Sequence, residues 1–467
     1  MEERTLSFFA RACQAEFLER QPGKGVRGIC TDSRSVQAGD LFVAIAGDRF
    51  DGHEYVEQAL AQGAVGAVVE RRALARLDAV KTGNLLVVEN SRHALGSMAA
   101  EYRRGFDLPV VAVGGSNGKT TTKELLASAL RQRWTALSSE ASFNNEIGVP
   151  VTLLKLERTH GAAVLEAGTN HPGELAPLLR MIQPRYGILT SIGREHLEFF
   201  GDLEGVAREE GAVGEVLPVE GTLFVNGDFA GLDFLLRRTR AGVTRVGFNA
   251  NNDWRPRILK MDAAGVVFHV AAPDAQWTGE YFVPLPGRHQ ASNATLAIAT
   301  AALLGLTREQ VQRGLTTCPP PKMRMQIWEC DGVKILDDAY NANADSMLAA
   351  LRTLRDMECA GRRVAVLGDM AELGAHGRAA HIEIGRAAGE CRVDAVVAVG
   401  QWAGVVTVEA GRAGVGTTMA LQTAEEAGAA VREYARRGDL VLFKASRAMR
   451  MERASACFMP ESAGSGR

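Results

Sequence analysis

Short apolar segments alternate with stretches of helical periodicity along most of the chain. Apolar runs that predict buried strands lie at residues 41–45, 109–113, 162–165, 186–192, 222–225, 333–336, 364–367, 395–399 and 440–443. Helical periodicity occurs between such runs, as at residues 55–62 and 123–131. Strands that alternate with helices favour parallel sheets with helices on both faces. The pattern therefore predicts the α/β class.

The order of these segments divides the chain into three blocks. Residues 1–107 mix short strands with a helical run, residues 108–318 alternate strands with helices, and residues 319–467 repeat that alternation. The sequence Cys318-Pro319-Pro320-Pro321 ends the second block and has the composition of a stiff linker. A chain of 467 residues is long enough for about three domains. We therefore expect a mixed α/β N-terminal domain, a central parallel-sheet domain and a C-terminal Rossmann-like domain.

Composition and charge narrow the class of protein. The chain is 46% hydrophobic and has a formal net charge of −2, with no basic block, which argues against a nucleic-acid or membrane-surface partner. No apolar stretch approaches the ~18 residues of a membrane span, and the first twenty residues contain no apolar segment of signal-peptide length. The seven cysteines include no Cys-x-x-Cys pair, which indicates free thiols in a reducing compartment. We expect a cytoplasmic protein that acts as a monomer.

The most informative motif follows the strand at residues 109–113. It reads Gly-Gly-Ser-Asn-Gly-Lys-Thr-Thr-Thr, from Gly114 to Thr122, and precedes a helix. Glycines let backbone N–H groups approach a phosphate, the helix N-terminus favours its charge, and Lys119 can reach the β and γ phosphates. Thr120 is placed to ligate Mg²⁺, and Val113 stands where an ordinary Walker loop has its first glycine. The candidate nucleotide-binding residues are Gly115, Ser116, Asn117, Gly118, Lys119, Thr120 and Thr121.

This loop predicts that the central domain is P-loop ATPase-like. A glycine-rich turn without a ligand is the alternative interpretation. Polar clusters also follow four further predicted strands, at residues 166–171, 191–196, 368–372 and 444–447. Open α/β sheets bind ligands at the carboxyl ends of their strands. Because the clusters occur in two successive blocks, we expect a cleft between the central and C-terminal domains.

The charge of ATP requires cations in this site. Two unit charges ~4 Å apart interact by about 4 kcal/mol at an effective dielectric constant of ~20. We expect Lys119 and a Mg²⁺ held by Thr120 and Glu166 to supply this positive charge. Glu166 ends a buried strand, where an unpaired carboxylate is costly, so a metal ion is a natural partner for it. His196 is a candidate ligand of a second Mg²⁺, and Arg324 could reach the γ-phosphate across the cleft. The alternatives are a solvent-facing Glu166, a structural His196 and a surface Arg324.

Together these residues resemble those of the Mur ligases, ATP-dependent amide ligases of peptidoglycan precursor assembly, over nearly the whole chain. The loop Gly-Ser-Asn-Gly-Lys-Thr-Thr is similar to the loop of that family, which folylpolyglutamate synthetases share. Thr31-Asp32-Ser33-Arg34 and residues 39–43 and 51–53 resemble the UDP-sugar-binding domain. The resemblance implies that ATP and two Mg²⁺ are the cofactors. It also implies that Asp32, Ser33 and Arg34 bind the UDP-sugar.

The resemblance extends to the nucleotide and the muramoyl peptide. Residues 144–150 and 170–174 match the segments with which Mur ligases contact the muramoyl peptide and the metals. This match implicates Asn144, Asn145, Asn170 and His171. The segment at residues 287–289, together with Asn293, resembles the segment that contacts adenine in Mur ligases. This resemblance implicates His289 and Asn293 in adenine binding. Asp338 matches the ribose-binding aspartate.

The third block resembles the branch of the family that adds D-alanyl-D-alanine to a UDP-N-acetylmuramoyl-tripeptide. The matching segments are residues 337–343, 346–347 and 368–374, and the Asp-Asn-Pro-Arg usual in the diaminopimelate-adding branch is absent. The implied substrate-binding residues are Tyr340, Asn341, Asn343, Asp369, Glu372, Lys444, Ser446 and Arg447. The branch that adds the third amino acid and a folylpolyglutamate-type ligase are the alternatives. A regulatory GTPase is disfavoured, because no Asn-Lys pair occurs in the chain.

One position departs from the family pattern. Many Mur ligases carry, some residues after the metal histidine, a lysine that CO₂ carbamylates to present an anion to the second Mg²⁺. This chain has Glu210 at that position. Our hypothesis is that Glu210 supplies the anionic oxygens directly, and the alternative is a surface glutamate on an amphipathic helix.

The resemblance also implies a reaction order. The terminal carboxylate of the tripeptide attacks the γ-phosphorus of ATP, and the amine of the dipeptide then attacks the acyl phosphate. The expected catalytic residues are Lys119, Glu166, His196, Glu210 and Arg324. No side chain is identifiable from the sequence as the base that takes the amine proton.

Overall fold

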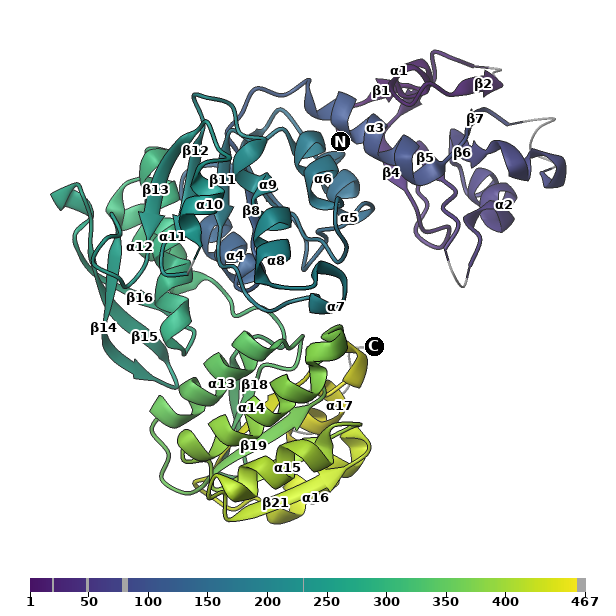
Figure 1. Ribbon diagram of the computed structural model, residues 1–467. Helices are drawn as coiled ribbons and strands as arrows, with labels where there is room; N and C mark the ends of the chain where they lie inside the picture. The colour runs from purple at the N-terminus through teal and green to yellow at the C-terminus, as the bar shows by residue number, and fades with distance from the viewer. Residues whose placement is uncertain (19–20, 48–49, 78–82, 230, 460–467) are drawn as a thin grey trace.

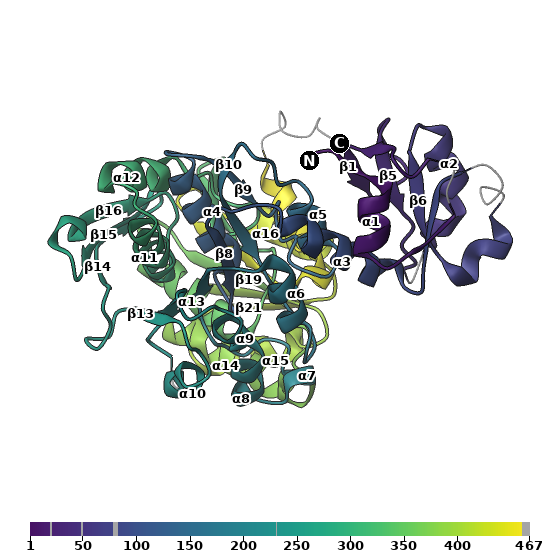
Figure 2. The ribbon, with the colours of Figure 1, turned by 90° about the horizontal axis from the view of Figure 1, so that it is seen from above.

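The computed structural model describes residues 1–18, 21–47, 50–77, 83–229 and 231–459. Over these residues the chain forms five sheets, two of them six-stranded, which belong to three successive bodies (Figure 1). The N-terminal body stands to one side of the other two when the molecule is seen from above (Figure 2). The predicted fold class is confirmed.

The N-terminal body contains a five-stranded sheet of order β2-β7-β6-β5-β4, parallel except for β2. The strand predicted at 41–45 is present as β5, and the helical run at 55–62 is a 3₁₀ turn followed by α2. The elements are β1 (Arg4–Thr5), α1 (Leu6–Ala12), β2 (Glu16–Leu18), β3 (Gly25–Val26), β4 (Gly28–Cys30), β5 (Asp40–Val43), η1 (Gly52–Tyr55), α2 (Val56–Ala61), β6 (Gly66–Glu70), η2 (Arg71–Arg76), β7 (Leu85–Val88) and α3 (Ser91–Arg103).

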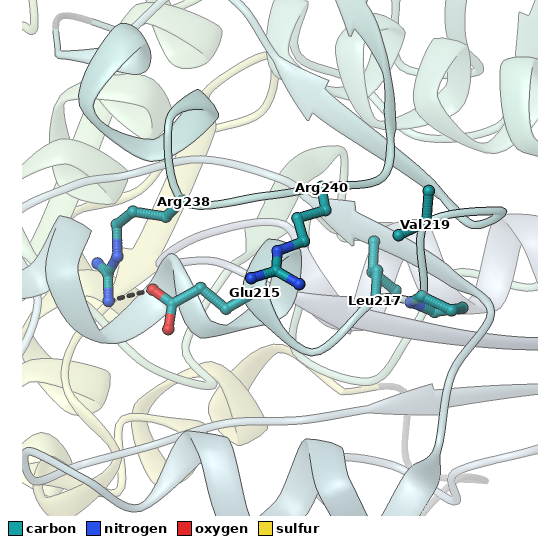
Figure 3. Close-up of a pocket in the computed structure, with 6 residues that line it drawn as sticks. Glu215, Leu217, Val219, Arg238 and Arg240 are labelled. Atoms are coloured by element: carbon teal, nitrogen blue, oxygen red, sulfur yellow. Dashed lines mark ion pairs between the residues drawn. The ribbon is translucent and has the colours of Figure 1, made fainter.

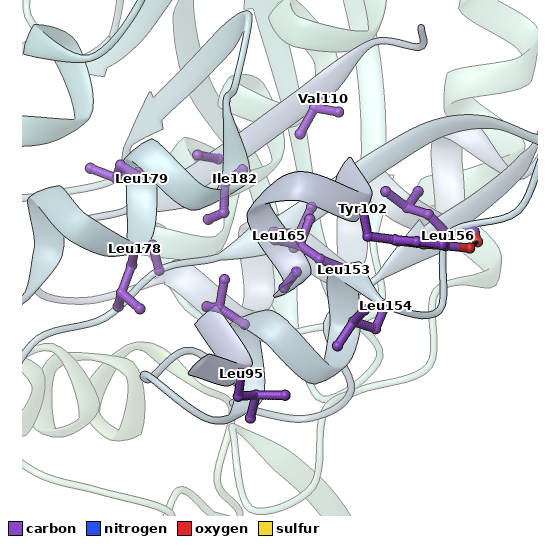
Figure 4. Packing of buried hydrophobic residues seen from close by; sticks show 14 of the residues in the cluster. Leu95, Tyr102, Val110, Leu153, Leu154, Leu156, Leu165, Leu178, Leu179 and Ile182 are labelled. Atoms are coloured by element: carbon purple, nitrogen blue, oxygen red, sulfur yellow. Dashed lines mark hydrogen bonds between the residues drawn. The ribbon is translucent and has the colours of Figure 1, made fainter. Parts of the chain in front are cut away.

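Helix α3 joins this body to the central one. Its buried Leu95 and Tyr102 belong to a cluster that includes leucines of two central helices, α5 (Gly148–Leu153) and α6 (Leu175–Ile182) (Figure 4). The Tyr102 hydroxyl donates to Leu156 O and accepts from Glu2 N, both at 2.7 Å, so this buried polar group is satisfied. The two bodies therefore share one core. Burial of each large apolar side chain in this core contributes about 1.5–3 kcal/mol to stability.

The central body is built on a fully parallel sheet of order β13-β12-β11-β8-β10-β9. Alternate residues of β8 face opposite sides, since Val110 and Ala112 join the cluster of α3, whereas Val111 and Val113 join the cluster of α4 and α11. Its elements are β8 (Val110–Gly114), α4 (Lys119–Leu130), β9 (Thr135–Ser138), α5 (Gly148–Leu153), β10 (His160–Glu166), α6 (Leu175–Ile182), β11 (Tyr186–Leu189), α7 (Leu197–Phe200), α8 (Leu203–Glu210), α9 (Ala212–Glu215), β12 (Thr222–Asn226), α10 (Leu232–Leu236), β13 (Gly242–Val246), α11 (Arg288–Leu303) and α12 (Arg308–Thr317).

Two boundaries predicted in the central body were wrong. The strand predicted at 186–192 ends at Leu189, and the helix predicted at 123–131 already begins at Lys119. A three-stranded antiparallel sheet, absent from the sequence prediction, packs beside α11. It comprises β14 (Arg255–Asp262), β15 (Gly265–Ala271) and β16 (Gly279–Val283), with η4 (Ala275–Trp277) before the last strand.

The C-terminal body has the sheet order β17-β18-β22-β19-β20-β21, in which only β17 is antiparallel. The strands predicted at 333–336, 364–367, 395–399 and 440–443 are confirmed. The elements are β17 (Gln326–Cys330), β18 (Val333–Asp337), α13 (Ala344–Asp356), β19 (Arg363–Gly368), η5 (Gly374–His376), α14 (Gly377–Glu390), β20 (Ala395–Val399), α15 (Ala403–Arg412), β21 (Thr417–Leu421), α16 (Ala424–Tyr434), β22 (Leu440–Lys444), η6 (Arg447–Met449), α17 (Glu452–Ser455) and η7 (Ala456–Phe458).

Two global expectations can be compared with the structure. All seven cysteines, each within the described residues, are free, as the sequence indicated. Among the helices that the structure describes, none is both long and apolar enough to span a bilayer.

Candidate active site

The glycine-rich loop between β8 and α4 has the backbone that its sequence requires. Gly115 and Gly118 have φ of +111° and +90°, values that favour glycine. A Cβ on Gly115 would lie 2.5 Å from Thr190 Oγ1, and one on Gly118 would lie 2.5 Å from Asn293 Oδ1. The loop is therefore held closely between the end of β11 and helix α11, with the N-terminus of α4 directed at it.

The segment after β11 fixes the loop by hydrogen bonds. Ser116 N donates to Ser191 O and Asn117 N to Ser191 Oγ, both at 2.9 Å. Gly193 N donates to Ser116 Oγ, also at 2.9 Å. Two of the five predicted polar clusters thus lie side by side, as expected for adjacent parallel strands.

Lys119 is largely enclosed and points back over its own loop. Its Nζ donates to Gly115 O and lies 3.6 Å from Glu195 Oε2. Burial opposes the charge of Lys119, but the carboxylates of Glu195, Glu210 and Glu166 outweigh burial and raise its pKa. Glu195 was not among the sequence candidates. Its position beside His196 in the cluster at 191–196 was the only signal available.

Thr120 and Glu166 are brought together as predicted. Thr120 Oγ1 donates to Glu166 Oε2, and Asn144 Nδ2 donates to Glu166 Oε1, both at 2.8 Å. The Glu166 side chain is buried at the end of β10, so the solvent-facing alternative is wrong. Asn144, predicted to meet the peptide, thus supports a residue predicted to hold Mg²⁺.

Glu210 is also buried rather than on a surface. Its Oε2 accepts a 2.6 Å hydrogen bond from Gly115 N, and its Oε1 has no partner among the described residues. Burial raises the pKa of Glu210 to about 8, against the influence of Lys119 and reinforced by Glu195. The helix α8 therefore directs an incompletely satisfied carboxyl group at the phosphate loop.

His196 meets the C-terminal body. Its Nδ1 lies 2.5 Å from Glu372 Oε2, and this close contact with His196 lowers the pKa of Glu372 against the effect of partial burial. Both residues have left-handed backbone, with φ of +48° and +59°. Such conformations cost energy in non-glycine residues and are typical of functional sites. The sequence analysis assigned these residues to separate roles, whereas the structure pairs them across the boundary between bodies.

Two of the three residues predicted for adenosine, Asp338 and His289, lie near Lys444, and the third, Asn293, lies at the phosphate loop. Lys444 Nζ lies 2.5 Å from Asp338 Oδ2 and donates to Asn341 O at 3.1 Å. The charges of Asp338 and Lys444 both affect the pKa of His289. Burial lowers this pKa to about 4, the negative charge of Asp338 opposes the decrease, and the positive charge of Lys444 adds to it. Asn293 Nδ2 donates to Gln290 Oε1 at 3.0 Å, on the side of α11 that touches Gly118.

Arg324 lies at the cleft, not on an open surface. Its guanidinium is 4.2 Å from the ring centre of Tyr340, and its Nη2 donates to Ser142 Oγ at 3.3 Å. Its charge acts on Lys119, whose pKa it lowers in part. The residue therefore connects the start of the C-terminal body to the phosphate loop.

Other predicted substrate residues hold local structure. Asn145 Oδ1 accepts from Ile147 N and Gly148 N, at 3.2 and 2.8 Å, at the start of α5. The backbone N–H groups of Asn170 and His171 donate to Glu174 Oε2 at 2.9 and 3.1 Å.

Several C-terminal candidates also bind one another. The Asp369 carboxylate accepts from Gln401 N at 2.7 Å and Trp402 N at 3.0 Å, so it caps the turn before α15. Ser446 Oγ donates to Asp369 O at 2.7 Å, and Arg447 N donates to Asn341 Oδ1 at 3.4 Å.

The UDP-sugar candidates are not at the phosphate loop. Arg34 Nη2 pairs with Asp32 Oδ2 at 2.7 Å, and this hydrogen-bonded pair lowers the pKa of Asp32 to about 2. Ser33 between them is buried. They follow β4 in the N-terminal body, which lies apart from α4 in both views (Figures 1 and 2).

A hollow of about 550 Å³ lies elsewhere, at the amino ends of β12 and β13 (Figure 3). Glu215, Leu217, Val219, Arg238 and Arg240 line it, and Arg238 already pairs with Glu215. Ligand sites of parallel sheets lie at the opposite, carboxyl edge. We therefore assign the chemistry to the loop edge and not to this hollow.

Comparisons with known proteins identify the family. Three family models match: "Mur ligase family, catalytic domain" at residues 25–103, "Mur ligase middle domain" at 113–301, and "Mur ligase, glutamate ligase domain" at 323–447. The chain is 37% identical over 388 residues to the UDP-N-acetylmuramoyl-tripeptide--D-alanyl-D-alanine ligase of Escherichia coli (strain K12), a match that covers 82% of this chain and 83% of that relative.

Solved structures are similar over nearly the full length. MurF from Acinetobacter baumannii matches with a TM-score of 0.88 and 31% identity, over 98% of both chains. MurF ligase from Thermotoga maritima in complex with ADP matches with a TM-score of 0.80 and 27% identity, over 93% of this chain and 97% of that chain.

Proposed function

Because the chain belongs to the Mur ligase family, we infer that it is an ATP-dependent ligase that joins D-alanyl-D-alanine to UDP-N-acetylmuramoyl-tripeptide. The observation that carries this inference is the 37% identity to a ligase of that name over most of both chains. The alternatives, addition of the third amino acid and folylpolyglutamate synthesis, are not favoured by this relative.

The loop geometry explains how ATP is held. The N-terminus of α4 and the backbone of the loop favour the charge of the β and γ phosphates. Lys119, now bonded to Gly115 O, has only to exchange that carbonyl for a phosphate oxygen. We assign His289 and Asn293, on α11 beside the loop, to the adenine and Asp338, in the C-terminal body, to the ribose. In support, Asn293 closely approaches Gly118 of the loop, and the charges of Asp338 and Lys444 both act on His289.

The side chains around the loop fit Mg²⁺. Mg²⁺ takes oxygen ligands, usually one or two carboxylates together with phosphates and waters. Thr120 and Glu166 present adjacent oxygens, and Glu210 Oε1 is a buried oxygen without a partner in the described chain. No group of three or more His, Cys, Asp or Glu side chains within the described ranges is arranged to hold a metal by itself.

We assign the donors as two sets. Thr120 and Glu166 would hold one ion, and Glu210 with His196 the other. Since Nδ1 of His196 lies against Glu372, we assign Nε2 to the metal or its water. When bound, Mg²⁺ neutralises charge on the phosphates during transfer.

The reaction needs positioning more than acid–base chemistry. The tripeptide carboxylate attacks the γ-phosphorus, which forms an acyl phosphate and ADP, and the dipeptide amine then attacks the acyl carbon and releases phosphate. Lys119 and Arg324 would supply positive charge to the γ-phosphate, where charge develops. Correct placement of two reacting groups is worth as much as about 7–11 kcal/mol of the barrier.

The remaining assignments concern where the substrates bind. We propose that Asp32, Ser33 and Arg34 bind the UDP-sugar, and that Asn144, Asn145, Asn170 and His171 bind the muramoyl peptide. Tyr340, Asn341, Asn343, Asp369, Glu372, Lys444, Ser446 and Arg447 are proposed for the dipeptide side. Asp369 and Lys444 would act there through the turns that they hold, since their charges already have partners.

We propose domain boundaries near residues 107 and 318. Both boundaries fall in the gaps between the family matches, which supports them. We further propose that the protein works as a monomer in the cytoplasm, where a reducing environment suits its seven free thiols.

Phosphate release tests the function. We expect release to require ATP, UDP-N-acetylmuramoyl-tripeptide and D-alanyl-D-alanine together, with a pentapeptide product of the summed mass less water. Parallel reactions with UDP-N-acetylmuramoyl-dipeptide plus diaminopimelate, and with folate plus glutamate, test the alternatives. Turnover in either of these, or with ATP alone at the full rate, would contradict the assignment.

A further inference from the structure

The segment that fixes the phosphate loop also contacts the C-terminal body. Gly193 binds Ser116 of the loop, and the next residue, Arg194, points the other way, to helices α13 and α14. Figure 1 shows both helices on the side of the C-terminal body that faces the central one. One short segment thus touches both sides of the cleft.

Arg194 makes five hydrogen bonds to two carboxylates of the C-terminal body. Its backbone N donates to Asp345 Oδ2 at 2.7 Å, and its Nε and Nη2 donate to Asp345 Oδ1 at 2.9 and 2.7 Å. Its Nη1 and Nη2 donate to Glu383 Oε2 and Oε1 at 2.6 and 3.3 Å. A planar guanidinium between two carboxylates fixes orientation as well as distance.

The start of α13 is held at the loop by a second contact. Asn343, the N-cap of α13, and Asn117 of the loop exchange side-chain hydrogen bonds at 3.0 and 3.4 Å. Gly193 permits this approach, because a Cβ there would lie 2.8 Å from Asp345 Oδ2. The N-terminal turn of α13 therefore contacts the loop through Asn343 and the adjoining segment at Gly193 through Asp345.

The strength of the Arg194 contact depends on its surroundings. An isolated surface ion pair contributes only about 0–1 kcal/mol. Arg194 is 28% exposed, and Asp345 and Glu383 are 37% and 42% exposed, so solvent screens the pairs in part. The shared guanidinium and the additional backbone donor make this a network, which couples its members more strongly than single pairs.

We propose that Arg194 is a positioning residue that holds the C-terminal body over the phosphate loop for the second half of the reaction. The inference depends on the proposed function, in which the acyl phosphate forms on the loop side and the dipeptide arrives from the C-terminal side. If the C-terminal body is not held in place, water replaces the amine. Water then attacks the acyl phosphate, which returns the tripeptide carboxylate and releases phosphate and a proton without a new amide bond.

The coupling ratio of phosphate to pentapeptide tests this role. The variants are Arg194→Gln, Glu383→Gln and Arg194→Lys, and Arg386→Gln is the matched control. Arg386 lies on α14 as Glu383 does, but it pairs with Glu409 of the same body, at 2.8 Å. Thermal melting should show that all four variants fold.

We expect Arg194→Gln and Glu383→Gln to release more than one phosphate per pentapeptide. Their kcat/KM for the dipeptide should fall about tenfold, with KM for ATP changed less than about twofold. Arg194→Lys should recover part of the coupling, and the control should match the wild type. A coupling ratio of one in every variant, with unchanged kcat/KM, would overturn the proposal.

Small-angle X-ray scattering separates this proposal from the proposed function. With ADP and UDP-N-acetylmuramoyl-tripeptide present, we expect a larger radius of gyration for Arg194→Gln than for the wild type and the control. If the wild type forms no pentapeptide, the function is wrong, yet the scattering comparison still decides whether Arg194 holds the bodies together. Equal radii in all samples would contradict the holding role.

Discussion

The ammonium group of Lys119 lies 3.6 Å from a carboxylate oxygen of Glu195, a residue that follows Arg194 in the chain. The same lysine also donates to Gly115 O of its own loop. Because these partners hold the ammonium group in the site, Lys119 is positioned before a nucleotide binds. Such preorganisation lowers the cost of binding and of charge stabilisation.

Replacement of this lysine gives the first prediction. Lys119→Ala should lower kcat by about 10²–10³-fold, because it removes a fixed positive charge at the transferring phosphate. Lys260→Ala on the exposed strand β14 is the control and should retain wild-type turnover. Steady-state assays of pentapeptide formation measure both. An undiminished rate in Lys119→Ala would remove the basis of the nucleotide site.

Glu210 gives a prediction about carbon dioxide. Its carboxyl group already occupies the place beside the loop, with Oε1 buried and unpaired within the described chain. We therefore expect full activity in buffers stripped of CO₂, and an intact mass without a carbamate. Glu210→Gln keeps the shape but cannot present a carboxylate to a metal ion, and should lower kcat and weaken Mn²⁺ binding measured by electron paramagnetic resonance.

Two results would contradict that account. One is a strong loss of activity without CO₂ that bicarbonate restores. The other is a Glu210→Gln variant with wild-type Mn²⁺ affinity and turnover.

The central sheet and its loop could be predicted because their signals are local. Strands buried on both faces read as continuous apolar runs, as β8 and β10 do. The glycines and the Lys-Thr pair of the loop act through their own backbone and helix N-terminus. For the same reason, the clusters after β8, β10 and β11 could be assigned to one edge before the structure was known.

The missed features depend on tertiary contacts. In β15 the buried Val266, Phe268 and Val270 alternate with less buried residues, but Val267 is apolar too and obscures the period of two. Glu195 became a site residue only through its burial beside Lys119. The pairing of His196 with Glu372 joins residues from different bodies, which no spacing along the chain specifies.

The glycine at the start of α4 provides a matched test of loop geometry. Gly118 and Gly414 have similar φ, +90° and +96°, but only at Gly118 would a Cβ meet a neighbour, Asn293 Oδ1 at 2.5 Å. Alanine at either position costs about 1–2 kcal/mol of backbone strain. Only Gly118→Ala should also weaken ADP binding, by about tenfold or more in calorimetric titration. Equal ADP affinities of the two variants would show that the close approach to Asn293 is unimportant.

Arg324 should act in phosphate transfer rather than in folding. Arg324→Ala should lower kcat about 10²-fold or more, and Arg324→Lys should recover little, because the fork over Tyr340 is lost. Arg257→Ala on the exposed side of β14 is the control for loss of an arginine. Single-turnover measurement of ADP formation isolates the step. Normal ADP formation in Arg324→Ala would place this residue outside the transfer.

The low pKa of His289 predicts an acid-dependent loss of stability. Burial lowers this pKa from 6.5 to about 4, so between these values the unfolded chain binds a proton that the folded protein does not. The free energy of unfolding should therefore be unaffected by His289 above pH 7 and should fall as the pH decreases from 6.5 towards 4. At pH 5 the contribution is about 1–2 kcal/mol.

Urea unfolding of the wild type and of His289→Gln at pH 5 and pH 7 isolates this contribution, because the other titrating groups are common to both proteins. Asp337, whose pKa burial raises to about 6, acts in the opposite direction and cancels in the difference. The variant should lose less stability than the wild type between pH 7 and pH 5. If both proteins lose the same amount, His289 takes up its proton in the folded protein, and its enclosure beside Asp338 and Lys444 is looser than the structure indicates.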